Sequence, residues 1–287
     1  MRSGGHRRAA GGRPGGGRRS RGRAAGCYVR GVRATQPGGV LGSTDHPPAA
    51  GARVFRAARP VRLGDADRYG RLRLDALARH LQDVATDDYA DAGLADGPVV
   101  WVVRRAAVRA TRWPRYLERV EYATFCNGLG PQWAERRTSA AGYGGGRVET
   151  AVLWASLDSR TGRPAPIPPG FPSLWGLPEG YRPVSARLLH PPPPPAAPRR
   201  PWELRATDLD VLGHVNNAGH WEAIEDVLAR TLRDRVPVTA ECEYRLPVDL
   251  GDAVTIASEI AGGILRVWLV SDRGLHASAV VSTAPAD

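Results

Sequence analysis

The sequence predicts an α+β fold made of two copies of one unit, each a long helix followed by several antiparallel strands. Each half contains an amphipathic helical stretch followed by runs rich in β-branched and aromatic residues. The halves also match at a constant spacing of 143 positions, at which Asp65 falls on Asp208, Asp67 on Asp210 and Gly70 on Gly213, without a gap through the following helices. A match at one spacing is typical of a duplicated unit.

Residues 1–52 precede the first unit and are rich in arginine and glycine. The stretch from Met1 to Ala50 holds ten arginines and one aspartate, which supplies nine of the eleven net positive charges of the chain. With almost no apolar periodicity this segment cannot offset the entropy of ordering, so we expect a disordered tail. A nucleic-acid tether and a targeting peptide are the alternatives.

The rest of the chain is close to neutral, and we expect its folded part to bind no nucleic acid. Cys27, Cys126 and Cys242 show no metal-binding or disulfide-framework spacing. We therefore expect no metal and no cofactor. No run approaches the roughly 18 apolar residues of a membrane span, which favours a cytoplasmic protein.

Residues 53–162 form the first predicted unit. Leu74, Leu77, Leu81 and Val84 recur at steps of three and four, which predicts one apolar face of a helix that ends near Gly93. Strands are expected over 99–113 and 118–128, and a further hairpin over 132–142 and 146–164, with turns at Trp113-Pro114 and in the glycine-rich stretch 142–146. The order is a strand, a long helix and then several antiparallel strands.

Residues 163–201 form a proline-dense segment that includes HPPPPPAAPRRP. Consecutive prolines neither donate sheet hydrogen bonds nor continue a helix, so we expect an extended linker, with a polyproline ligand for a partner as the alternative. The second unit, residues 202–287, repeats the first. Its helix presents Trp221, Ile224, Val227 and Leu228 on one side, and strands are expected over 236–246, 252–260, 264–271 and 275–283.

The turn DLDVLGHVNN, residues 208–217, and the later stretch EYRLPVDLGD resemble the acyl-ACP thioesterases. In the first half LQDVATDDYADAGL and WASLDSRTGRP occur in the order that this family shows. The resemblance covers residues from about 54 to the C-terminus and implies two tandem hotdog folds, each a long helix wrapped by an antiparallel sheet. It also implies hydrolysis of fatty acyl thioesters carried by acyl carrier protein (ACP) or coenzyme A (CoA). We also expect a homodimer.

The polar cluster before the second helix supplies the candidate catalytic residues: Asp210, His214, Asn216 and Asn217. A carboxylate that orients an imidazole makes a general base for water, and we expect Asp210 and His214 to form that pair. Backbone N–H groups of Val215, Asn216 and Asn217 at the helix start are placed to stabilise an oxyanion. The structural alternative is that an asparagine caps the helix, Asp210 braces the turn and His214 packs.

The turn departs from the family pattern, Asp-x-Asn-x-His, because Leu212 stands at the asparagine position. A Glu-Cys pair expected after EYR falls on Pro247 and Val248, so Asp249, Glu241 or Glu243 is left to supply a carboxylate. Cys242 lies on the apolar side of an alternating strand and is expected in the core rather than as a nucleophile.

The first unit has Arg71 and Arg73 where the second has His214 and Asn216. We therefore expect the second unit to react and the first to line the acyl pocket through Leu74, Leu77, Leu81 and Val84, which are equally explained as core. Arginines of the first unit are candidates for receiving the acidic ACP: Arg104, Arg105, Arg109, Arg112 and Arg115. The alternative function, motivated by Leu212, Pro247 and Val248, is a non-catalytic acyl or acyl-carrier binding protein.

Overall fold

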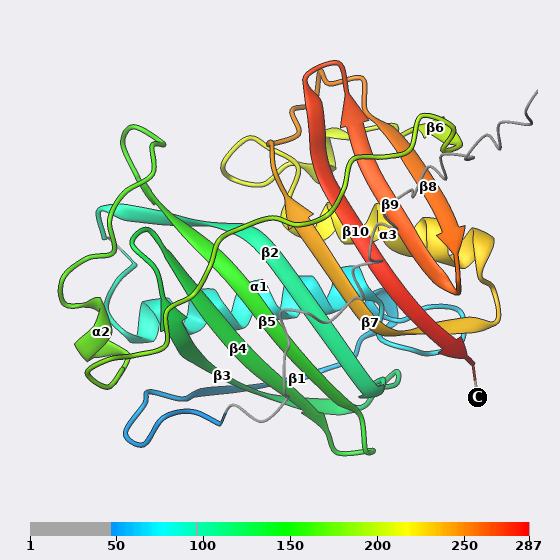
Figure 1. The fold of residues 1–287 in the computed structure, drawn as a ribbon. Coiled ribbons are helices and arrows are strands. Elements are labelled where there is room, and N and C mark those ends of the chain that lie inside the picture. Colours follow the sequence, from blue (N-terminus) through cyan, green and yellow to red (C-terminus); the bar gives the residue numbers. More distant parts are fainter. Residues whose placement is uncertain (1–46, 96, 287) are drawn as a thin grey trace, which may run out of the picture. The chain divides into compact units, whose positions relative to one another are not determined.

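The described residues of the computed structural model, 47–95 and 97–286, contain one antiparallel sheet of ten strands in the order β1-β3-β4-β5-β2-β7-β10-β9-β8-β6 (Figure 1). The first five strands along the chain are β1 (Phe55–Pro60), β2 (Val99–Arg112), β3 (Arg119–Leu129), β4 (Trp133–Gly142) and β5 (Arg147–Asp158). The others are β6 (Arg199–Pro201), β7 (Arg235–Tyr244), β8 (Thr255–Ala261), β9 (Ile264–Ser271) and β10 (Gly274–Pro285). The helices are α1 (Leu74–Asp91), α2 (Phe171–Leu174) and α3 (Asn217–Thr231), with short 3-10 turns η1 (Leu63–Asp65) and η2 (Ala206–Asp208).

Strands β2 and β7 join the two halves into this one sheet. They pair antiparallel, with Ala106 opposite Cys242 and Val108 opposite Ala240. The predicted pair of hotdog units, with their sheets side by side, is thereby confirmed.

The two long helices lie on the same face of the sheet and share one core with it (Figure 1). Leu74 and Leu77 of α1 and Trp221 and Ile224 of α3 are all at most 2% exposed. Burying a side chain of this size contributes roughly 1.5–3 kcal/mol, so the apolar stripes seen in the sequence fix both helices against the strands.

The segment 163–201 packs against the sheet along much of its length. Phe171 stacks on Trp175 at 4.6 Å between ring centroids, and Trp175 is only 1% exposed. Further along, indole N–H groups hold this segment to the sheet face opposite α1 and α3. Trp133 Nε1 donates to the Val184 carbonyl at 2.7 Å, and Trp268 Nε1 donates to the Pro191 carbonyl at 2.8 Å. Its last residues, β6, pair with β8.

The predicted tail, residues 1–52, lies outside the described residues except for 47–52, which are largely exposed. Cys27 lies outside them as well. Within the described ranges no helix combines the length and the apolar character that a membrane span requires.

Candidate active site

The turns that precede α1 and α3 share most of their hydrogen bonds at the spacing of 143. In the first turn the Tyr69 N–H donates to Asp67 Oδ1 at 2.9 Å, and in the second the Leu212 N–H donates to Asp210 Oδ1 at 2.9 Å. Each turn contains a glycine with positive φ, +78° at Gly70 and +79° at Gly213, a conformation that side chains disfavour. The same backbone therefore carries two different sets of side chains.

In the second turn His214 pairs with Asp249. His214 Nδ1 lies 2.6 Å from Asp249 Oδ1, and both side chains are roughly half-exposed. Arg273 binds the same carboxylate and also Asp252, at 2.9 Å. The hydrogen bond from Arg273, and then the one from His214, lower the pKa of Asp249. The carboxylate is thus held ionised and fixes the imidazole with Nδ1 as its donor nitrogen.

Asp210 does not have the partner predicted from the sequence. Its two carboxylate oxygens accept hydrogen bonds from the Leu212 N–H at 2.9 Å and from Asn216 Nδ2 at 3.3 Å. The expected pairing of Asp210 with His214 is therefore corrected to Asp249 with His214. Asp210 braces the turn, as the structural alternative held, whereas His214 does not pack into the core.

The start of α3 leaves one of the three expected backbone donors available. The Val215 N–H donates to the Val248 carbonyl and the Asn216 N–H to the Asp208 carbonyl, each at 2.9 Å. Asn216 caps the helix, because its Oδ1 accepts the Ala218 N–H at 2.9 Å. Within the described part of the chain the Asn217 N–H has no hydrogen-bond partner, and it lies at the positive end of the helix dipole.

A narrow cavity of about 20 Å³ lies between α1 and α3 and reaches Asn217. Leu74, Leu77 and Leu81, three of the four residues expected to contact the acyl chain, line it. Val84 is buried in the core and does not line the cavity. The other lining residues are Ala78, Gln82, Val103, Ala106, Val108, Val152, Trp154, Asn217, Trp221 and Tyr244. The cavity is mainly apolar, and its volume is about what one water molecule requires.

The first turn is closed by an ion-paired network. Arg71, which stands where His214 stands in the second turn, binds Asp67 at 2.9 Å and both carboxylate oxygens of Glu225 at 2.8 and 2.9 Å. Glu225 Oε1 also accepts the Leu74 N–H at 2.9 Å, at the start of α1. A much wider groove of about 1420 Å³ lies beside this turn, and Arg71 and Glu225 line it. The backbone N–H at the start of α1, that of Leu74, is already bound to Glu225.

The counterpart of Asp249 in the first half is Arg115. The Leu72 N–H donates to the Pro114 carbonyl at 2.9 Å, as the Val215 N–H does to Val248. The residues that follow these two acceptors are Arg115 and Asp249. Because Arg71 meets an arginine there rather than a carboxylate, it turns to Asp67 and Glu225, and the first half cannot form a histidine–carboxylate pair.

The remaining cysteines of the described residues are buried. Cys242 is 0% exposed, and burial raises the pKa of its thiol far above the usual range. Burial also raises the pKa of Cys126 to about 11. A thiol kept protonated is a poor nucleophile, so the expectation that Cys242 belongs to the core is confirmed.

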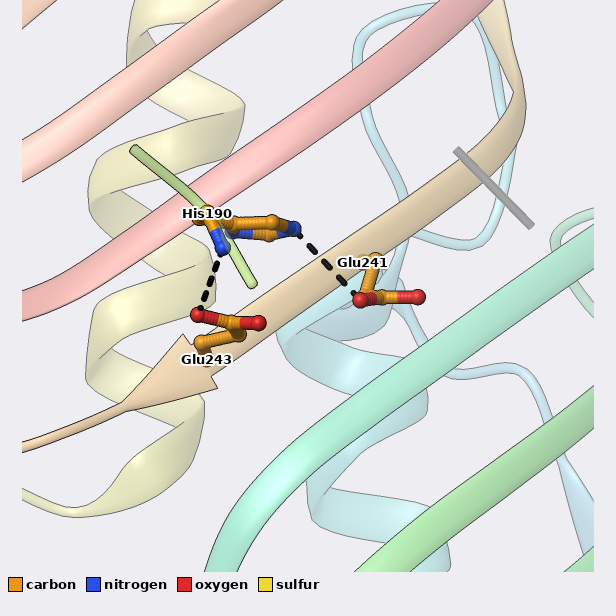
Figure 2. A group of neighbouring side chains, drawn as sticks. All are labelled: His190, Glu241 and Glu243. Carbon is orange, nitrogen blue, oxygen red and sulfur yellow. Dashed lines mark hydrogen bonds and ion pairs between the residues drawn. The ribbon is translucent and has the colours of Figure 1, made fainter. Parts of the chain in front are cut away.

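Glu241 and Glu243 lie on the face of β7 opposite Cys242, and they contact His190 of the segment 163–201 (Figure 2). His190 Nε2 is 3.4 Å from Glu241 Oε1, and the His190 backbone N–H donates to Glu243 Oε2 at 3.1 Å. These three residues offer donor atoms within 4.8 Å of one another, a spacing that a metal ion could use. Glu243 also accepts Arg245 at 2.8 Å and the Leu189 N–H, so its carboxylate is already neutralised and clamps the linker to the sheet.

Arg105 takes part in the same clamp and is lost as an ACP contact. It is 6% exposed and donates to the Arg187 carbonyl at 2.9 Å. Of the other expected ACP arginines, Arg104 and Arg109 are partly buried, whereas Arg112 and Arg115 are exposed.

The fold defines a class of protein, the tandem hotdog proteins. The N-terminal domain model of the acyl-ACP thioesterases matches residues 52–174, and the C-terminal domain model matches residues 195–277. The chain belongs to the acyl-ACP thioesterase family.

Individual proteins are similar to this chain over most of its length. An uncharacterized protein of Mycobacterium tuberculosis is 28% identical over 217 residues, which cover 76% of this chain and 87% of that protein. The structure of the 12:0-ACP thioesterase from Umbellularia californica is 20% identical, with a TM-score of 0.69 over 81% of this chain and 97% of that one. An acyl-ACP thioesterase from Bacteroides thetaiotaomicron is 18% identical, with a TM-score of 0.67 over 80% and 98%. At these identities the two solved structures support the fold alone.

Sequence reasoning left the carboxylate of the site undecided among three residues, and it missed Glu225. Asp249 follows Val248, whose carbonyl accepts the Val215 N–H and so brings Asp249 next to His214. Only the tertiary fold reveals this contact. The alignment of the two helices already contained a clue to Glu225, because at the spacing of 143 this carboxylate corresponds to the neutral Gln82.

Proposed function

We propose that this chain hydrolyses fatty acyl-ACP thioesters at the start of α3, with His214 as general base and Asp249 as the residue that orients it. The observation that carries the proposal is the 2.6 Å contact between His214 Nδ1 and Asp249 Oδ1 beside a helix start with an available N–H. His214 Nε2 has no partner among the described residues and is left to accept a proton.

The reaction follows from these groups. His214 Nε2 takes a proton from water as the water oxygen bonds to the thioester carbonyl carbon. The carbonyl π pair moves onto oxygen, and the Asn217 N–H with the helix dipole stabilises the charge. The pair then returns, the carbon–sulfur bond breaks, and the thiolate takes the proton from His214. The products are a fatty acid and the carrier thiol.

The acyl chain is proposed to enter between α1 and α3, where Leu74, Leu77 and Leu81 line the cavity. The cavity has room for about one water molecule, so the side chains or helices that line it must shift to admit an acyl chain. The family supports ACP as the carrier, with CoA as the alternative. Exposed Arg112 and Arg115 remain available to an acidic carrier, the cytoplasm is the proposed location, and a homodimer remains a prediction.

A non-catalytic acyl-carrier binding protein is the second candidate, and Leu212 favours it. Leu212 lies in the turn that carries Asp210, and its half-exposed side chain offers no hydrogen bond to substrate or water. The His214–Asp249 pair outweighs this observation, because the pair supplies a base without residue 212.

The test is release of free thiol from a panel of acyl-ACP and acyl-CoA substrates by the wild type and His214→Ala. We expect turnover by the wild type and a kcat lower by about 10²- to 10⁴-fold in the variant, the usual worth of a positioned base. Binding of acyl thioester without thiol release by the wild type would establish the binding-protein alternative instead.

A further inference from the structure

In the first half of the chain, the backbone N–H at the start of α1 is bound to a side chain of the facing helix. The Leu74 N–H donates to a carboxylate oxygen of Glu225, a residue of the facing helix α3, at 2.9 Å. At the spacing of 143 the counterpart of Leu74 is Asn217, and the counterpart of Glu225 is Gln82 on α1. The facing pair in the second half is therefore the Asn217 N–H and the Gln82 side chain.

Gln82 and Asn217 line the same cavity, which supports their pairing independently of the alignment. The Gln82 side chain is partly buried and makes no hydrogen bond among the described residues. Most of its neighbours there are leucine, valine, alanine and tryptophan. The Gln82 amide is therefore free to donate a hydrogen bond to a ligand that enters the cavity.

We propose that Gln82 is a catalytic residue, whose side-chain N–H donates to the thioester carbonyl oxygen together with the Asn217 N–H. The inference rests on the proposed function. As the water oxygen bonds to the carbonyl carbon, the π pair moves onto the oxygen between these two donors. It returns when the carbon–sulfur bond breaks, and no other atom moves at Gln82.

The difference between Gln82 and Glu225 explains why one site is open and the other closed. A carboxylate only accepts hydrogen bonds, so Glu225 occupies the helix-start N–H itself and takes the place that an oxyanion would take. A neutral amide donates, and it leaves the helix-start N–H to the substrate. Arg71 completes the closure in the first half by neutralising Glu225, whereas His214 leaves the second half without that charge.

The experiment compares Gln82→Ala and Gln82→Glu with the wild type in steady-state thioester hydrolysis. Thr86→Ala, an exposed position one turn further along α1, is the matched control and should keep wild-type kinetics. Loss of one oxyanion donor should lower the kcat of Gln82→Ala by about 10²- to 10³-fold with a small change in KM. Gln82→Glu should fall at least as far near neutral pH, and its activity relative to the wild type should rise as the pH falls and the carboxyl group becomes protonated.

The outcomes separate this inference from the proposed function. If the wild type hydrolyses thioesters and His214→Ala does not, but Gln82→Ala retains the wild-type kcat, the role of Gln82 is overturned and the base remains. A Gln82→Glu variant whose relative activity does not depend on pH also overturns it. A far-ultraviolet spectrum and melting transition like those of the wild type show that each variant folds. A wild type that releases no thiol from any substrate overturns the proposed function, and with it this inference.

Discussion

The two turns that precede α1 and α3 have similar backbones but carry different side chains. In residues 62–73 an arginine, two carboxylates and the start of α1 satisfy one another, and the Arg71 and Glu225 side chains are less than a tenth exposed. In residues 205–216 the histidine is half-exposed and its carboxylate partner comes from the loop after β7. One copy has become a structural joint between α1 and α3, while the other keeps groups that a substrate can reach. Identical local structure therefore does not predict identical chemistry.

The largest expected effect distinguishes the two carboxylates near His214. Asp249→Asn should lower kcat by about 10²-fold or more, because the amide no longer fixes the imidazole as the carboxylate does. Asp210→Asn is the matched variant and should cost much less, since Asp210 contacts only the turn and Asn216. Steady-state kinetics of both variants is the measurement. A larger loss in Asp210→Asn would restore the pairing predicted from the sequence.

The joint in the first half should matter for stability and not for chemistry. Glu225→Gln leaves the buried guanidinium of Arg71 without its bidentate partner, and we expect a loss of about 3 kcal/mol in the free energy of unfolding. Glu222→Gln, one turn earlier on α3 and half-exposed, should change it by less than about 0.5 kcal/mol. Urea denaturation measures both. Equal losses would mean that the network is not a structural joint.

His220 and its counterpart Leu77 sharpen the comparison through pH. Burial lowers the pKa of His220 to about 4, whereas an unfolded histidine titrates near pH 6.5. Between these values the unfolded chain binds a proton that the folded chain does not, so stability falls as the pH falls. From about pH 7.5 to about pH 5 this contributes a loss of about 2 kcal/mol. His220→Leu should lose that much less over the same interval, and a variant with an unchanged pH dependence would contradict the assignment.

The smallest effect concerns the two helix starts. Asn216 caps α3 with its side chain, whereas Arg73 makes no side-chain cap at α1. Asn216→Ala should therefore lower the free energy of unfolding by about 1 kcal/mol, and Asn216→Ser should recover most of the loss. Thermal and urea unfolding measure both variants. No recovery with serine would show that the hydrogen bond to Asp210, and not the cap, is what Asn216 contributes.

Much of the fold could be predicted because its signals are local. The apolar repeat of Leu74, Leu77 and Leu81 placed α1, and strand alternation placed Cys242 in the core. The linker was harder, because proline content predicts an extended chain but says nothing of whether Trp175 finds a surface to pack on. Burial of that indole depends on the completed sheet, which no local pattern contains.

The site was predicted to the level of the turn but not to the level of its bonds. Asp210 is close to His214 in sequence, yet the backbone of the turn draws its carboxylate to Leu212 and Asn216. Asp249 lies 35 residues away and reaches His214 only because Val248 pairs with Val215. Hydrogen bonds within a turn follow from spacing, whereas those between segments require the tertiary fold.

The pairing of β2 with β7 has a consequence for how such a protein can change. In a dimer of two identical chains every substitution appears twice, so replacing the histidine of one turn by arginine would remove both reaction centres together. Here the equivalent partners belong to one polypeptide, and each can mutate without the other. Because the two halves are covalently linked, their sequences need not stay identical. A mutation that strengthens the packing of one half therefore does not have to preserve catalysis in that half.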